Sequence, residues 1–85
     1  MSALEDISRY NDDVLKACVR MMDSKALLTR SGWTQRFPEI THDVLDRMIG
    51  FNLITEWGPS EWSLTPKGTA VAQAALQLKP SIIER

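Results

Sequence analysis

Hydrophobic residues recur at helical spacing along the first part of the chain. They fall on one stripe when the residues are placed on a helix, and this stripe contains Leu4, Ile7, Val14, Cys18 and Met22. The pattern predicts one or two helices over residues 3–23. Ser2 and Glu5 have the spacing of a capping box at the first start, and Asn11 and Asp12 offer a second start.

Two further helices are expected before residue 52. The first would begin at Ser24 and end at Gly32, because glycine adopts the left-handed conformation that ends many helices. Its apolar residues are Ala26, Leu27 and Leu28. The second would begin at Pro38, since proline suits a first helical position. Its core-facing stripe would contain Ile40, Val44, Leu45, Met48 and Phe51.

After Asn52 the helical spacing gives way to short β-branched and aromatic runs. Residues 53–57 and 62–65 have the composition of strands, and residues 58–61 have that of a turn. Such a turn would place Trp57 opposite Trp62 across a β-hairpin. The next two residues, Thr65 and Pro66, have the order of a helix cap and a first helical residue, and the helix would end before Pro80.

These elements predict a mainly α fold with a small β-hairpin. The expected order is a three-helix core, a two-stranded hairpin and a C-terminal helix. With 85 residues and 44% hydrophobic composition, the chain supports a single domain over residues 1–85. Because so small a domain buries limited surface, a partner or a second copy is expected to contribute to its stability.

At two short phrases the chain resembles the winged helix-turn-helix superfamily. Bacterial regulators of that superfamily end the recognition helix with an apolar pair, and Phe51, Asn52, Leu53 and Ile54 stand in the corresponding place. They close the wing with a phrase similar to the run Leu64, Thr65, Pro66, Lys67 and Gly68. The resemblance covers roughly residues 12–78 and is to the multiple-antibiotic-resistance and phenolic-acid regulator branches. It implies a recognition helix and a two-stranded wing in a DNA-binding transcriptional regulator.

Overall charge gives no general signal for nucleic acid or membranes. Lys and Arg number 10, Asp and Glu number 11, and the sequence pI is about 5.7, so any phosphate-binding surface must be local. No run approaches the roughly 18 to 20 apolar residues that span a bilayer, and residues 1–10 lack a signal-peptide core. The lone Cys18 fits a reducing compartment, so a cytoplasmic location is expected.

Residue types that support catalysis or metal binding are scarce. A single His and a single Cys cannot build a zinc site, or a nucleophile with its base. Asp12 and Asp13 are adjacent, as are His42 and Asp43, and neighbours on a helix point about 100° apart. The chain is therefore expected to be a binding protein rather than an enzyme, with no cofactor and no metal.

A DNA-binding surface is the first functional hypothesis. By the resemblance, the predicted helix over residues 38–51 would enter a major groove and read bases with Thr41, His42 and Arg47. Residues around it would contact the backbone phosphates: Arg30, Gln35, Arg36 and Lys67. The same helix carries Glu39, Asp43 and Asp46, which would repel phosphate. The alternative is that the basic residues belong to an ordinary solvated face.

A protein-binding surface is the second hypothesis. The predicted hairpin carries Trp57 and Trp62 beside Glu56 and Glu61, whereas a wing that binds DNA usually offers arginine or lysine. An exposed tryptophan pair would anchor a protein interface, and a pair that faces inward would extend the core. Both alternatives stay open for these two residues. Trp33 is expected to be a core or cap residue.

Apolar residues near the two ends are candidates for a homodimer interface: Leu4, Ile7, Val71, Leu78, Ile82 and Ile83. Packing of these residues within one chain is the alternative. A two-fold dimer would pair the recognition helices and so raise the affinity of weak individual contacts. The expected partners are double-stranded DNA or a protein, together with a second copy of the chain and without a membrane.

Overall fold

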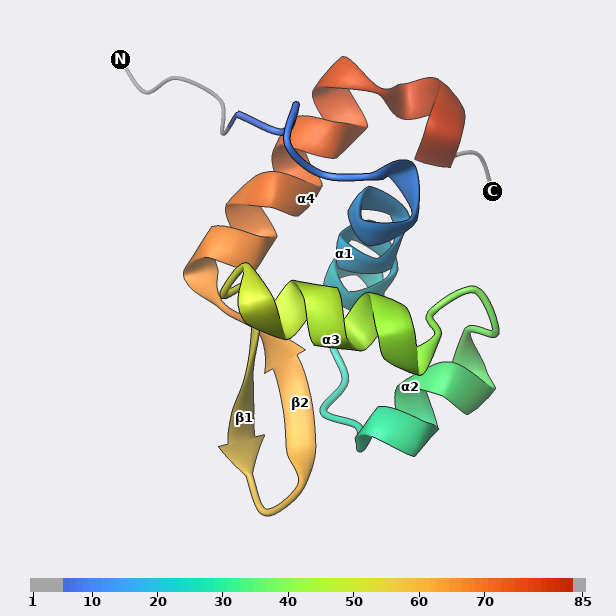
Figure 1. The fold of residues 1–85 in the computed structure, drawn as a ribbon, viewed down its shortest axis with the longest axis vertical. Coiled ribbons are helices and arrows are strands. Elements are labelled where there is room, and N and C mark those ends of the chain that lie inside the picture. Colours follow the sequence, from blue (N-terminus) through green and yellow to red (C-terminus); the bar gives the residue numbers. More distant parts are fainter. Residues whose placement is uncertain (1–5, 84–85) are drawn as a thin grey trace.

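In the computed structural model, which describes residues 6–83, the chain forms a mainly helical domain with a two-stranded antiparallel hairpin (Figure 1). The elements in chain order are α1 (Asp12–Ser24), α2 (Arg30–Arg36), α3 (His42–Gly50), β1 (Ile54–Gly58), β2 (Glu61–Leu64), α4 (Pro66–Leu78) and the 3-10 helix η1 (Pro80–Ile83). The predicted class, mainly α with a small hairpin, is confirmed.

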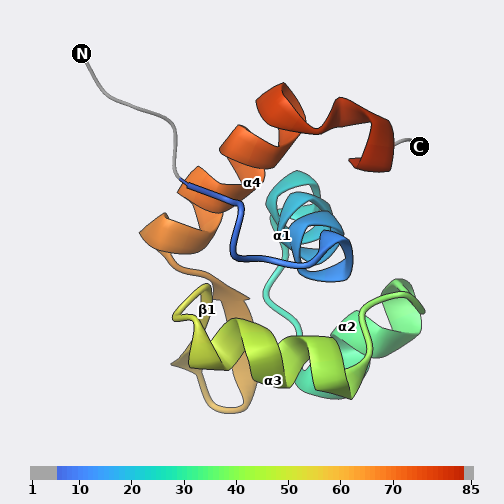
Figure 2. The same ribbon diagram turned by 45° about the horizontal axis from the view of Figure 1, so that its top comes forward.

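The core lies between α1 and α4, which run side by side in both views (Figures 1 and 2). Fully buried residues of α1 include Val14, Leu15 and Cys18. The facing side of α4 carries small buried residues, among them Ala72 and Ala75, which allow the two helices to approach closely. The amphipathic spacing read from the first part of the sequence therefore does mark a core face.

The start of α1 corrects the predicted extent of the first helix. The helix begins at Asp12, at the second of the two starts, and residues 6–11 are not helical. Asp6 accepts hydrogen bonds from the N–H (3.0 Å) and the hydroxyl (2.7 Å) of Ser8, which close a local turn in place of a helical one. The predicted capping box, Ser2 with Glu5, lies outside the described residues.

The second predicted helix is wrong in both of its ends. Ser24 closes α1, residues 25–29 form a connection, and Gly32 lies inside α2. The cap is Thr29, whose Oγ1 accepts a hydrogen bond from the Gly32 N–H at 3.0 Å. Leu28 forms an isolated β-bridge with Trp62, so its backbone pairs with the hairpin and is not helical.

The third helix is shorter than predicted. It begins at His42 rather than Pro38, because Thr41 Oγ1 accepts the Val44 N–H at 3.2 Å and caps the helix there. Pro38 lies in a turn. Of the predicted inward stripe, Ile40, Val44, Leu45 and Met48 are buried. Phe51 follows the helix and is partly buried against the core.

The hairpin forms where it was predicted, with a different register. Ile54 pairs with Leu64, and Glu56 pairs with Trp62. The strands shift between Glu56 and Gly58, so Trp57 is the extra residue of a β-bulge and does not lie opposite Trp62. The predicted four-residue turn is also wrong, because Gly58 and Glu61 pair with each other as the ends of the two strands.

Helix α4 starts as predicted, and its cap and first turn are hydrogen-bonded to and packed against the base of the hairpin. Thr65 Oγ1 accepts the Gly68 N–H at 3.0 Å and its hydroxyl donates to the Asn52 carbonyl at 2.7 Å. The Thr65 N–H donates to the Leu53 carbonyl at 2.9 Å. A Cβ at Gly68 would clash with that same Leu53 oxygen, so glycine is required for this close approach. No helix among residues 6–83 is both long and apolar enough to cross a membrane.

Candidate macromolecule-binding surface

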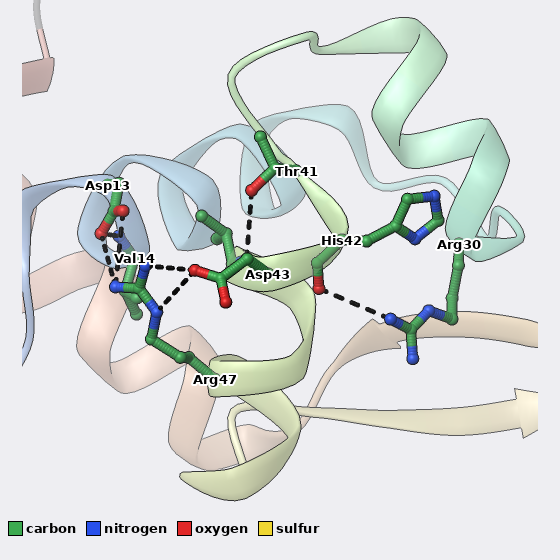
Figure 3. Close-up of polar contacts among 8 residues, drawn as sticks. Asp13, Val14, Arg30, Thr41, His42, Asp43 and Arg47 are labelled. Carbon is green, nitrogen blue, oxygen red and sulfur yellow. Dashed lines mark hydrogen bonds and ion pairs between the residues drawn. The ribbon is translucent and has the colours of Figure 1, made fainter.

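The outward face of α3 holds most of the residues that were predicted to read DNA. Because Val44, Leu45 and Met48 face the core, the opposite side of the helix presents His42, Asp43, Asp46, Arg47 and Gly50. Figure 3 shows Arg47 reaching toward the α1 side of this face and Arg30 approaching it from α2. Helix α3 thus has one basic and two acidic side chains on its exposed stripe.

Arg47 is held by two carboxylates (Figure 3). Its Nη2 and Nε donate to Asp43 Oδ2 at 2.5 and 3.2 Å, and its Nη1 approaches Asp13 of α1 at 3.5 Å. The hydrogen bonds to Asp43, and then the charge of Asp13, raise the pKa of Arg47 above its ordinary value. All three guanidinium nitrogens therefore have partners within the domain.

Arg30 is also paired, although it lies on a different helix. Its Nη2 donates to Asp46 Oδ1 at 2.6 Å and approaches the His42 carbonyl at 3.5 Å. These contacts join the start of α2 to the exposed face of α3. The structure thus brings together Arg30 and His42, two of the predicted DNA-binding residues, and pairs the Arg30 guanidinium with the Asp46 carboxylate.

The same pairing extends to other cations around α3 and α1. Arg20 Nε donates to Glu39 Oε2 at 3.1 Å, and Lys79 Nζ lies 3.7 Å from Asp12. The pKa of Glu39 is below its ordinary value, because its own backbone N–H and then Arg20 stabilise the carboxylate. Each pair is exposed enough to contribute only about 0 to 1 kcal/mol to stability. Their main effect is on the surface charge.

The remaining predicted phosphate contacts lie on separate elements. Arg36 ends α2, where its guanidinium lies 5.8 Å from the centre of the Phe37 ring, and the neighbouring Gln35 is exposed. Lys67 is exposed in the first turn of α4. These two helix ends flank opposite ends of α3 (Figure 1). Helix α3, which lies between these two helix ends, exposes Asp43 and Asp46 as well as its one arginine.

Thr41 has a structural role at the start of α3. Its Oγ1 accepts the Val44 N–H, and Figure 3 shows this bond at the top of the helix. A threonine that caps a helix is worth about 0.5 to 2 kcal/mol of stability. Its presence at this position is therefore explained without a bound base.

The two tryptophans of the hairpin have different environments. Trp57, in the bulge, is 55% exposed. Trp62 is partly buried against the core, and its backbone is fully used: its N–H donates to the Leu28 carbonyl and its carbonyl accepts the Trp33 indole N–H, both at 2.8 Å. Trp33 itself is fully buried, as expected. The core alternative therefore applies to Trp62, and Trp57 is the exposed member.

The candidate dimer residues are divided between core and surface. Ile7 and Val71 are buried, and Ile82 packs partly against the core. Leu78 is 55% exposed at the end of α4. Leu4 and the side chain of Ile83 lie outside the described part of the chain. Packing within one chain thus accounts for the buried residues, and Leu78 alone of the four described side chains presents a large apolar surface to solvent.

Residues 6–83 contain no pocket and no group of three His, Cys, Asp or Glu side chains that could hold a metal ion. Cys18 is buried, and its burial raises the pKa of the thiol to about 12. The candidate recognition surfaces are the exposed face of α3 and the hairpin.

Sequence reasoning missed the ion pairs in which the charged side chains on the exposed face of α3 take part. The Asp43 to Arg47 pair was visible as a four-residue helical spacing. No local signal connects Arg30 with Asp46, or Arg47 with Asp13, because each pair depends on how the helices pack.

Comparisons of the chain with family models, curated proteins and solved structures find no match.

Proposed function

We propose that this chain is a winged-helix-like domain that binds another protein through its hairpin. The observation that carries the proposal is the chemistry of residues 54–64, a stretch without Lys or Arg. Trp57 is 55% exposed, Glu56 precedes it, and Glu61 pairs with the following residue, Gly58. Tryptophan is enriched among the residues that dominate protein interfaces. A hairpin that binds along the DNA backbone needs cations near the phosphates, whereas this hairpin carries carboxylates.

The charge of α3 supports the same conclusion. If α3 entered a major groove, Arg47 and Arg30 would exchange their carboxylate partners for phosphates or bases. Breaking exposed pairs would cost only about 0 to 1 kcal/mol each. Asp43 and Asp46 would then remain beside the phosphate backbone without a counter-charge, and this repulsion opposes binding.

DNA binding by a homodimer is the second candidate. It is supported by the resemblance to winged helix-turn-helix regulators and by the exposed residues Gln35, Arg36 and Lys67. The two cations among them form no ion pair within residues 6–83. The exposed Leu78 near the C-terminus would contribute to the dimer contact. This candidate requires retention of a duplex with an affinity that falls steeply as salt rises.

Affinity capture tests the first candidate. Tagged full-length protein would be exposed to a lysate of the organism that encodes it, beside Trp57→Ala and a control, Leu27→Ala, which removes another exposed apolar side chain. We expect at least one protein to be captured by the wild type and by Leu27→Ala and to be lost with Trp57→Ala. Capture that does not depend on Trp57, or capture of nucleic acid alone, would remove the basis of the proposal. Trp62 is unsuitable for this test because it supports the core.

A further inference from the structure

We propose that the open edge of β1 binds an extended arginine- or lysine-containing segment of the partner protein as an additional strand, with Trp57 packing on one of its cationic side chains. This inference rests on the protein-binding function proposed above and adds the chemistry of the partner. It follows from the strand order, the charge and the bulge of the hairpin.

The strand order leaves β1 at a free edge. Within residues 6–83, β1 pairs only with β2, and the other edge of β2 is partly covered by the bridge to Leu28. Figure 1 shows the outer edge of β1 facing away from the helices. An edge of this kind presents backbone groups that can pair with another strand.

The register identifies which backbone groups point outward. The Trp62 N–H donates to Leu28, away from β1. In an antiparallel pair, residues directly opposite each other direct their backbone groups either toward one another or both away. Glu56 lies opposite Trp62, so its N–H and carbonyl point to the open edge.

The charge of the hairpin selects a cationic segment. Glu56 and Glu61 form no ion pair within the described part of the chain, although Glu56 Oε2 accepts the Ser60 N–H at 2.8 Å. No Lys or Arg lies between Ile54 and Leu64 to neutralise them. Side chains of an added strand would stand beside Glu56 on β1, with Glu61 one strand further away on β2. Between neighbouring strands, opposite charges stabilise and like charges destabilise the pairing.

A second copy of the chain fits this edge poorly. Two β1 strands paired around a two-fold axis would bring the Glu56 carboxylates of the two copies near one another, which is unfavourable. The bulge at Trp57 also interrupts the regular edge, a device that limits pairing between identical strands. A basic segment from another protein would be attracted to Glu56 instead of repelled by it. It would pair only with the short regular edge before the bulge.

Trp57 lies at the end of that regular edge. The bulge places it out of register with β2, and more than half of its surface is open to solvent. The face of an indole ring attracts guanidinium and ammonium groups. An arginine or lysine near one end of the bound segment would therefore contact both the Trp57 ring and a neighbouring carboxylate.

Selection from a displayed random peptide library on the full-length protein tests the inference. We expect the selected peptides to carry net positive charge and to alternate cationic with β-branched residues. Trp57→Ala should weaken their binding by about tenfold or more. The double variant Glu56→Gln with Glu61→Gln, which keeps the acceptor for the Ser60 N–H, should weaken it severalfold, and Leu27→Ala should leave it unchanged.

N-methylation of the best peptide, one amide at a time, examines the strand pairing itself. An added strand uses every second amide, so the loss of affinity should alternate along the peptide. Selected peptides without positive charge, a loss that does not alternate, or no peptide above background would overturn the inference. If lysate capture still depends on Trp57, the protein-binding function stands without the added strand; if it does not, that function itself fails.

Discussion

The indole N–H of Trp33 donates a 2.8 Å hydrogen bond to the backbone carbonyl of Trp62. This bond joins α2 to β2. The Trp62 N–H continues the connection to Leu28. The hairpin is therefore fixed to the helical core along its β2 side, which leaves β1 as the side available to a partner.

Replacing Trp33 by phenylalanine should destabilise the domain by about 2 to 4 kcal/mol. The substitution removes the donor to the Trp62 carbonyl and leaves unfilled volume at a fully buried position. Urea unfolding followed by circular dichroism would measure the effect. The matched control is Trp57→Phe, at an exposed position, which should change stability by no more than about 0.5 kcal/mol. Equal effects of the two substitutions would contradict this account of the hairpin.

The two glycines Gly68 and Gly50 should respond to alanine in opposite ways. A Cβ at Gly68 meets the Leu53 carbonyl, so Gly68→Ala should cost at least about 2 kcal/mol. A Cβ at Gly50 meets no atom within 4 Å, and this helical residue has no positive φ. Gly50→Ala should therefore stabilise the domain by up to about 1 kcal/mol. Thermal unfolding of both variants checks the prediction, and a harmless Gly68→Ala would show that α4 does not pack closely on the hairpin base.

Burial of Cys18 should make stability fall at alkaline pH. The pKa of the thiol is about 12 in the folded domain, against 9.0 when it is unperturbed. At pH 8 and below the thiol is almost fully protonated in both states and has little effect. Between pH 9 and 12 only the unfolded chain ionises, which favours unfolding.

Urea unfolding at pH 8 and pH 10 would measure this effect. The thiol should account for a loss of about 1 kcal/mol at the higher pH. The control is Cys18→Ala, which is destabilised at both pH values because it leaves a cavity, but should lack this share of the pH dependence. An identical pH dependence in the two proteins would show that the thiol is not shielded from water.

Local sequence signals predicted the parts of the fold that depend on neighbouring residues. The Thr65 and Pro66 start of α4 and the two strand runs are signals of this kind. The start of α2 was wrong because Leu28 is drawn into a bridge with Trp62, far along the chain. The tryptophan pairing was wrong because one bulged residue changes which side chains face each other, and composition does not reveal a bulge.

The sequence allowed the residues of the candidate site to be predicted. It did not allow prediction of which of its charges pair with one another. The acidic residues of α3 and of the hairpin were evident from the sequence. The pairing of Arg30 with Asp46 depends on how α2 meets α3, which no local pattern encodes. The exposed state of Trp57, in contrast to the half-buried Trp62, likewise follows from the register of a single hairpin.

Binding of a fluorescent mixed-sequence DNA duplex, titrated with the wild type and with a variant that combines Asp43→Asn and Asp46→Asn, tests the central claim most directly. The variant keeps the shape of α3 and removes the carboxylates that pair with Arg47 and Arg30. We predict no saturable binding by the wild type even at about 50 mM salt, and weak, salt-sensitive binding by the variant, with a Kd on the order of 10⁻⁴ to 10⁻⁶ M. Tight binding by the wild type that falls steeply with salt and is lost with Arg47→Ala would contradict the claim that these carboxylates direct the domain toward a protein partner.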